Sequence, residues 1–261
     1  MNRSRIIILS LVILSLILMA SCKGSEKRKL PDKATTEAIV EYATLPSFKT
    51  LLPLIDENST GSRLITTPME ATKNPVKSAF RTGVLTANML IAEKRNDIAT
   101  TKMSSTALVN SDSFVLGKEQ KQKYLAQLSS YYQTNDWDKL GKSLDQLKKR
   151  IETDVWERQD FEMYTITILG GWIEATRQIY GLLSEKDSTQ AVKITTENTW
   201  NMLRSNMDLF KTRSLLDDPA IKETKARINQ LAAIETAAKG NYSMDQINQA
   251  LKLCESIKAL F

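Results

Sequence analysis

The sequence contains no histidine and few residues of three other kinds: 2 cysteines, 6 prolines and 9 glycines in 261 residues. Without histidine there is no Ser-His-Asp triad, no HExxH zinc site and no histidine pH switch. So few prolines and glycines exclude a turn-rich all-β protein of this length. The chain also lacks P-loop and Gly-x-Ser-x-Gly patterns. We therefore expect a protein that is not an enzyme, with no cofactor and no metal site.

The first residues are organised like an export signal. Arg3 and Arg5 are followed by Ile6 to Ala20, a run of 15 residues that carries no charge. A membrane-spanning helix needs about 20 apolar residues, so this run is short for a permanent span. A basic start, a short apolar middle and small residues before a cleavage site are typical of a secretory signal peptide. The sequence predicts a signal peptide over residues 1–21.

The residues that lead into Cys22 resemble the lipobox of bacterial lipoproteins, with Met19 in the place that Leu usually takes. The resemblance implies that Cys22 is diacylated on sulfur and becomes the mature N-terminus. Several acyl chains are needed for a stable membrane anchor, because one chain holds only marginally. Lys23 follows where an Asp would imply inner-membrane retention, so we expect the outer membrane, on the leaflet that faces the periplasm. An uncleaved anchor or an ordinary signal peptide cut nearby remain alternatives.

The net charge of +6 is concentrated before the folded region. Residues 1–33 hold 7 basic and 2 acidic side chains, which leaves 29 basic and 28 acidic ones in residues 34–261. Nucleic-acid-binding proteins concentrate positive charge on the folded module, so no nucleic-acid partner is expected. We interpret residues 22–33 as a flexible lipidated tether. It could also rest against anionic lipid headgroups.

Helical periodicity dominates from residue 74 onward. Asn74-Pro75 and Asp218-Pro219 are helix starts, Asn96 is a helix end, and Ser243 with Gln246 forms a capping box. The segment from Phe161 to Leu183 is apolar on most sides, which is typical of a central, buried helix. Short connections between successive helices favour antiparallel neighbours. We predict an all-α fold, an up-and-down antiparallel bundle of about seven or eight helices forming a single domain over 34–261.

Two further features belong to this domain. Residues 45–73 contain prolines that break any long helix, so we expect an irregular segment that covers the bundle, with a functional loop as the alternative. Its expected apolar anchors are Leu51, Leu52, Leu54, Ile55, Leu64 and Ile65.

With Cys22 acylated, Cys254 has no disulfide partner, and it lies on a helical stripe with Ile247, Ala250, Leu251, Ile257 and Phe261. We expect a buried core thiol.

Glycines inside helices mark the candidate site. Gly170-Gly171-Trp172-Ile173-Glu174 and the run around Gly83 resemble motifs of a family of uncharacterised helical lipoproteins of Gram-negative envelopes. That family shows Tyr, Asp and Gly where this chain has Leu85, Asn88 and Ala175. The resemblance implies a fold and a location, not a reaction.

Each helical glycine costs about 1 kcal/mol relative to alanine, so a close approach of another backbone or a ligand should offset it. One reading is a ligand-binding pocket lined by Asn88, Trp172, Glu174 and Arg177. The other is a tight helix crossing in which Glu174 and Arg177 pair three residues apart.

Three functional hypotheses remain. The first is a membrane-anchored, non-enzymatic helical module that binds an envelope protein partner or a small ligand. The second is a carboxylate-dependent enzyme acting on envelope glycans, suggested by the dense acids Glu152, Asp154, Glu157, Asp160 and Glu162. The third is a purely structural lipoprotein. A tetratricopeptide-like scaffold is a further alternative, because Asn135-Asp136-Trp137 and Gly240-Asn241-Tyr242 occupy similar turns. The 34-residue repeat of that class does not recur at a fixed period.

Overall fold

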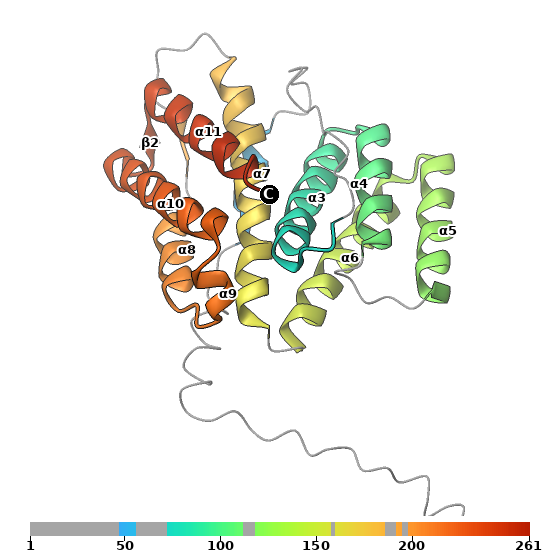
Figure 1. Ribbon diagram of the computed structural model, residues 1–261. Coiled ribbons are helices and arrows are strands. Elements are labelled where there is room, and N and C mark those ends of the chain that lie inside the picture. Colours follow the sequence, from blue (N-terminus) through green and yellow to red (C-terminus); the bar gives the residue numbers. More distant parts are fainter. Residues whose placement is uncertain (1–46, 56–71, 112–117, 158–159, 186–191, 195–197) are drawn as a thin grey trace, which may run out of the picture. The chain divides into compact units, whose positions relative to one another are not determined.

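The computed structural model describes residues 47–55, 72–111, 118–157, 160–185, 192–194 and 198–261 (Figure 1). All of them belong to one compact unit, Glu41–Phe261. The described residues form nine α-helices, one 3-10 helix and two short strands, so the all-α prediction is confirmed. The predicted signal peptide, Cys22 and the tether lie outside the described residues. None of the described helices has the length and apolar character that a membrane span requires.

The elements follow one another in the order η1 (Phe48–Leu54), α3 (Pro75–Lys94), α4 (Ile98–Asn110), α5 (Lys118–Thr134), α6 (Trp137–Glu157), α7 (Phe161–Ser184), β1 (Val192–Lys193), α8 (Thr199–Asp208), α9 (Arg213–Leu216), α10 (Pro219–Ala238), β2 (Asn241–Tyr242) and α11 (Met244–Lys258). The helices expected from periodicity are all present. The four-residue α9 and the 3-10 helix η1 are additional.

The predicted caps start the helices. The Asn74 side chain accepts a hydrogen bond from the amide of Lys77, and Pro75 occupies the first helical position of α3. Asp218 caps α10 in the same way, and Ser243 forms a reciprocal capping box with Gln246. These contacts satisfy amides that have no partner inside the helix. Asn96 has a φ of 56°, a left-handed backbone that ends α3 where the sequence predicted.

Helix α7 is the centre of the unit. It packs most extensively on α3 and α11, two helices that are far from each other in sequence, and it lies between them in Figure 1. Most of its residues are buried, which confirms the prediction that it is enclosed by neighbours. In repeat arrays each unit contacts only the next one. Helix α7 packs on α3 and α11, which are distant from it in sequence, so the unit is not organised like a repeat array.

Helices α3 and α7 touch through their main chains. A Cβ placed on Gly83 would lie 1.9 Å from the carbonyl oxygen of Thr167, and one on Gly170 would lie 2.1 Å from that of Phe80. Real Cβ atoms do not approach an oxygen so closely, so both positions require glycine. The sequence analysis gave a close backbone approach as one explanation of these glycines, and the structure contains it.

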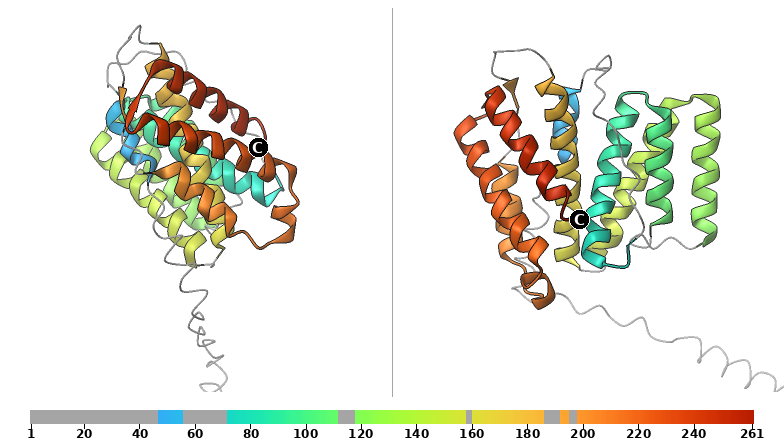
Figure 2. Two further views of the ribbon diagram at one scale, coloured as in Figure 1. Left: turned by 90° about the vertical axis from the view of Figure 1, so that its left-hand side faces the viewer. Right: turned by 45° about the horizontal axis from the view of Figure 1, so that its top comes forward.

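The C-terminal helices close the unit on the other face of α7 (Figure 2). Helix α10 packs on α8 and α11, and β1 pairs antiparallel with β2, with Val192 opposite Tyr242. This two-stranded ladder was not predicted. The end of α11 is held against α3: the Arg81 guanidinium donates to the carbonyl oxygen of Phe261 at 2.9 Å, and Phe261 stacks on Phe80 with ring centroids 4.2 Å apart.

The glycine contact gives a stability test. Alanine has the better helix propensity by about 1 kcal/mol, but the methyl group in Gly83→Ala would overlap the Thr167 carbonyl. We expect Gly83→Ala to lower the free energy of unfolding by about 3 kcal/mol, measured by urea denaturation. Gly141→Ala is the matched control, because its methyl would meet only the movable carboxylate of Glu93. Equal stability of the two variants would show that the main-chain contact is not tight.

Candidate functional site

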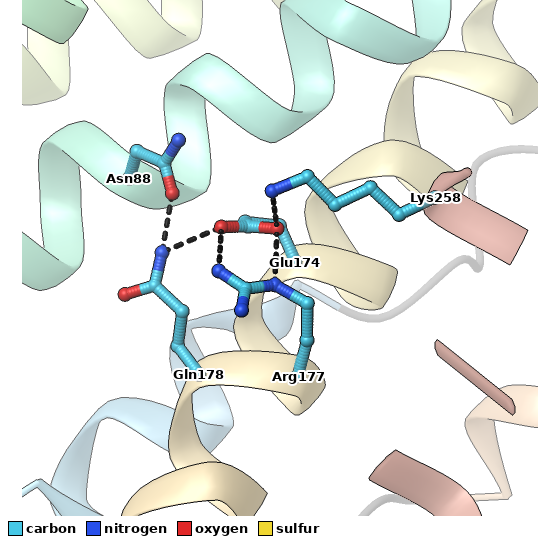
Figure 3. A network of polar contacts seen from close by, with 5 residues as sticks. All are labelled: Asn88, Glu174, Arg177, Gln178 and Lys258. Carbon is cyan, nitrogen blue, oxygen red and sulfur yellow. Dashed lines mark hydrogen bonds and ion pairs between the residues drawn. The ribbon is translucent and has the colours of Figure 1, made fainter. Parts of the chain in front are cut away.

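Five polar side chains meet where α3, α7 and α11 come together (Figure 3). Asn88 comes from α3 and Lys258 from the last turn of α11, while Glu174 lies on α7 one turn before Arg177 and Gln178. We call these five residues the Glu174 cluster. It joins the three helices that form the most extensive packing of the unit.

Glu174 is the hub of the cluster, and its side chain has an exposed fraction of 0%. Its Oε1 accepts from Nη2 of Arg177 at 2.8 Å and from Nε2 of Gln178 at 2.7 Å. Its Oε2 accepts from Nε of Arg177 at 3.0 Å and from Nζ of Lys258 at 2.7 Å. A carboxylate has about four acceptor positions, so these four donors engage its full capacity. The expected pair between Glu174 and Arg177 is present, and it is bidentate.

Gln178 extends the cluster to α3. Its side-chain amide donates both to Glu174 and to the side-chain oxygen of Asn88. Asn88 and Gln178 are themselves buried, with 2% and 1% of their surface exposed. A buried amide without partners is costly, so this contact fixes the position of α3 relative to α7.

The charged side chains of the Glu174 cluster differ in how deeply they are buried. Burial alone would raise the pKa of Glu174, but the hydrogen bonds and charges of Arg177 and Lys258 outweigh it and hold that pKa below its usual value. Burial lowers the pKa of Lys258, although the charge of Glu174 acts in the opposite direction. For Arg177, burial would lower the pKa, but the hydrogen bonds and charge of Glu174 outweigh it and raise the pKa. The Arg177 and Lys258 side chains are 13% and 22% exposed. Water therefore reaches the cations but not the carboxylate.

The structure brings together three of the four residues proposed for a pocket. Asn88, Glu174 and Arg177 share the cluster, whereas Trp172 packs edge-to-face on Trp200 with ring centroids 6.1 Å apart. Sequence reasoning missed two members. Gln178 stands four residues after Glu174, a spacing that places both on one helix face. Lys258 is 84 residues away from Glu174, and no sequence pattern links them.

The geometry favours the helix crossing over a pocket. Even a methyl group does not fit between the two main chains at Gly83 and Gly170. The polar groups of the cluster bind one another rather than pointing into open space. The arrangement is suited to holding helices in register, and it is poorly suited to exchanging a proton with a substrate.

The dense acids around residue 160 have structural partners where the structure describes them. Asp160 caps α7 by accepting from the amide of Met163, and Glu162 accepts from the amides of Lys211 and Thr212 at 2.5 and 3.0 Å. The side chains of Glu152, Asp154 and Glu157 lie outside the described residues. Among the described residues, no three His, Cys, Asp or Glu side chains are grouped so that they could hold a metal ion.

Cys254 is fully buried on the inner face of α11, as the stripe predicted, together with Ile247, Ala250, Leu251 and Ile257, and Phe261 beyond the end of the helix is also buried. Burial, reinforced by the negative charge of Glu174, raises the pKa of the Cys254 thiol. A thiol reacts through its thiolate, so this cysteine is unreactive while the unit is folded.

A shallow hollow lies on the surface where the end of α5 meets the starts of α4 and α6. Its lining is aromatic, aliphatic and amide, and it consists of Ile98, Tyr131, Tyr132, Asn135, Trp137 and Leu140. Ile98 is 37% exposed, and Met103 further along α4 is 36% exposed. No charged side chain lines the hollow. The hollow has no space for a water molecule, so it does not enclose a small molecule.

Replacing the hub carboxylate tests its structural role. Glu174→Gln removes the carboxylate that pairs with Arg177 and Lys258, and we expect the free energy of unfolding to fall by about 3 kcal/mol at pH 7. Because the pKa of Glu174 is lowered on folding, its contribution is present above about pH 4.5 and is lost as the pH falls below that value. The difference between the wild-type and Glu174→Gln proteins in urea denaturation should therefore shrink in acid.

Asp217→Asn is the control, because the ion pair of Asp217 with Arg213 is exposed, at 66% and 94%. Such a pair contributes little, so this variant should differ from wild type by less than about 0.5 kcal/mol at any pH. A Glu174→Gln protein as stable as Asp217→Asn, or a cost that does not change with pH, would contradict the assigned role.

Comparison of the chain with protein-family models, with curated proteins and with solved structures finds no match.

Proposed function

We propose that this chain is a lipid-anchored protein of the cell envelope whose helical unit binds a protein partner and catalyses no reaction. Cleavage before Cys22 and acylation of its sulfur would tether the unit to the membrane, with the outer membrane and its periplasm-facing leaflet as the expected location. The support for the anchor is the basic, apolar and small-residue order of residues 1–22. Stable attachment follows from two or three acyl chains.

The non-catalytic part of the proposal rests on the state of Glu174. It is the buried acid of the central helix, and four donors engage both of its oxygens. A general acid or base must reach the proton that it transfers. Glu174 is enclosed and paired with two cations, so this carboxylate gives the enzyme alternative no support.

The partner-binding part rests on the hollow between α4, α5 and α6, and this is the observation that carries the proposal. Tyrosine and tryptophan are enriched at protein interfaces, where charged residues are depleted from the buried centre. The lining of the hollow has this composition. The hollow has no space for a water molecule, so it does not suit a small ligand, which needs a concave and enclosing site, and a partner would pack on the surface that these side chains form.

The anchor is tested by replacing its sulfur. In cells given a clickable fatty acid, we expect the wild-type chain to incorporate the label and to sediment with membranes. Cys22→Ser should lose the label, because the thioether cannot form. Cys254→Ser is the matched control and should keep the label, since Cys254 is buried in the folded unit. A wild-type chain without label, or a Cys22→Ser chain with label, would overturn the lipoprotein assignment.

The hollow is tested by placing a charge in it. Ile98→Asp introduces a carboxylate at the first position of α4, where the helix dipole favours an acid, so the helix itself should not be weakened. After cross-linking in cells and purification from detergent-solubilised membranes, we expect at least tenfold less of a stoichiometric partner with Ile98→Asp.

Leu216→Asp is the control for that experiment. Leu216 is also exposed, at 44%, but it lies in α9 and not in the hollow. The proposal requires that the partner be retained by Leu216→Asp. Equal recovery with both variants, or no stoichiometric partner with the wild-type protein, would contradict it.

A further inference from the structure

Helix α4 has almost no charge, although one of its sides faces outward. Lys102 is the only charged residue among its 13 residues, and the others are aliphatic, small or uncharged polar side chains. A surface helix usually presents charged side chains to water, whereas a helix without them is usually covered by neighbours. The extensive packing of α4 is on α3 and α5, and it lies between these two helices in Figure 1. Its third side is left without a helix of the unit to cover it.

The outward side of α4 is a stripe that we call the α4 face. Its members are exposed or half-buried and recur at spacings of three and four residues: Ile98, Ala99, Lys102, Met103, Thr106 and Ala107. Ile98 and Met103 are 37% and 36% exposed, and Leu216 is the one other large hydrophobic side chain exposed to this degree among the described residues. Because Ile98 also lines the hollow, the α4 face continues the surface that we propose binds a partner.

Lys102 lies in the middle of the α4 face. No acidic side chain within the described part of the chain pairs with its ammonium group. Exposed lysines of α10 differ in this respect, because Lys222 pairs with Asp217 and Lys225 pairs with Asp208. An apolar surface with one unpaired cation is complementary to an apolar surface that carries one carboxylate.

We propose that the α4 face binds an amphipathic helix of the partner protein, with a carboxylate of that helix opposite Lys102, which rests on the partner binding proposed above. Side chains three and four residues apart form ridges and grooves that accept those of a second helix. Ala99 and Ala107 stand four residues before and after Met103, and their small side chains allow a second helix to approach closely. Helices that bind in this way present apolar residues at the same spacings.

Two other occupants match the α4 face less well. In a symmetric contact between two copies of α4, Lys102 would meet Lys102, and α4 has no acidic residue to offset the repulsion. Helices that lie on a membrane surface carry Trp, Phe or Leu on one side and many Lys and Arg on the other. Helix α4 has no aromatic residue and only one cation. A helix that carries one carboxylate matches both the apolar stripe and the single cation.

The contact at Lys102 is tested with a carbodiimide, a reagent that joins a lysine side chain to a carboxylate in direct contact with it. On membranes that carry the full-length chain, we expect Lys102 to be linked to an Asp or Glu of a second protein, located by mass spectrometry. Apolar residues should recur at spacings of three and four around that carboxylate. Lys102→Gln should lose the cross-link. Lys222→Gln is the control and should keep it, because Lys222 is exposed but lies on α10.

Reversal of the charge shows whether the contact contributes to binding. Lys102→Glu should lower the recovery of the partner at least tenfold, and exchange of the cross-linked carboxylate for lysine should restore at least half of it. Lys222→Glu is the matched control and should leave recovery within twofold of wild type. Unchanged recovery with Lys102→Glu, failure of the exchanged pair to restore it, or the absence of any cross-link at Lys102 would overturn the proposal.

The close approach of a helix is tested by filling the space beside Met103. Ala99 is exposed, so Ala99→Trp should leave urea denaturation unchanged, but its ring would separate the two helices and lower the recovery of the partner at least tenfold. Ala226→Trp is the control at an exposed position of α10, and it should retain the partner. Full recovery with Ala99→Trp would show that no helix packs on the α4 face.

The outcomes separate this proposal from the one on which it rests. If Ile98→Asp abolishes recovery but Lys102→Glu and Ala99→Trp do not, the hollow binds a partner and the α4 face does not. A cross-link from Lys102 to a carboxylate of another copy of this chain would make the occupant a second copy. Binding of the Cys22→Ser protein to vesicles of phosphatidylethanolamine and phosphatidylglycerol, lost with Lys102→Glu, would make the occupant a membrane. Each of these results would overturn the helix assignment.

Discussion

The direct main-chain contact between α3 and α7 is the constraint on which the other features depend. Glycine at positions 83 and 170 lets the two backbones approach, and this approach brings Asn88 within reach of Gln178. The same face of α7 then presents Gly171 to Phe48 of η1 and Glu174 to α11. The absence of side chains at positions 83 and 170 thus allows the Glu174 cluster to form. Larger residues here would separate the helices and leave the polar groups of the cluster without partners.

A buried carboxylate is an expensive way to join helices, since its removal from water costs several kcal/mol. Four donors offset that cost for Glu174, and they come from two helices. Apolar packing allows two helices to shift relative to each other. The bidentate pair of Arg177 with Glu174, together with the Lys258 ion pair, is satisfied in one geometry only. The cluster therefore contributes specificity of helix placement. This accounts for a charged network in the most closely packed part of the unit without assigning it a ligand.

Local features of the fold were predictable, and distant ones were not. The caps at Asn74 and Asp218, the helix end at Asn96 and the buried face of α11 follow from residue types and spacings within one helix. The pair of Glu174 with Arg177 is of the same kind. Lys258, the pairing of β1 with β2 and the seating of Phe48 over Gly171 join segments distant in sequence. The glycines in α3 and α7 predicted a close approach of another backbone or a ligand. The neighbouring residues did not indicate which segment approaches, because a position without a side chain can accommodate any surface.

The contacts that hold the helical unit together lie apart from the surface that we propose binds a partner. The core contacts converge on α7, with α3 and α11 packed against it. The aromatic hollow lies instead on α4, α5 and α6. A partner packed on the hollow would not displace the Glu174 cluster, whose residues come from α3, α7 and α11. Binding there would leave the packing of α3 and α11 on α7 in place.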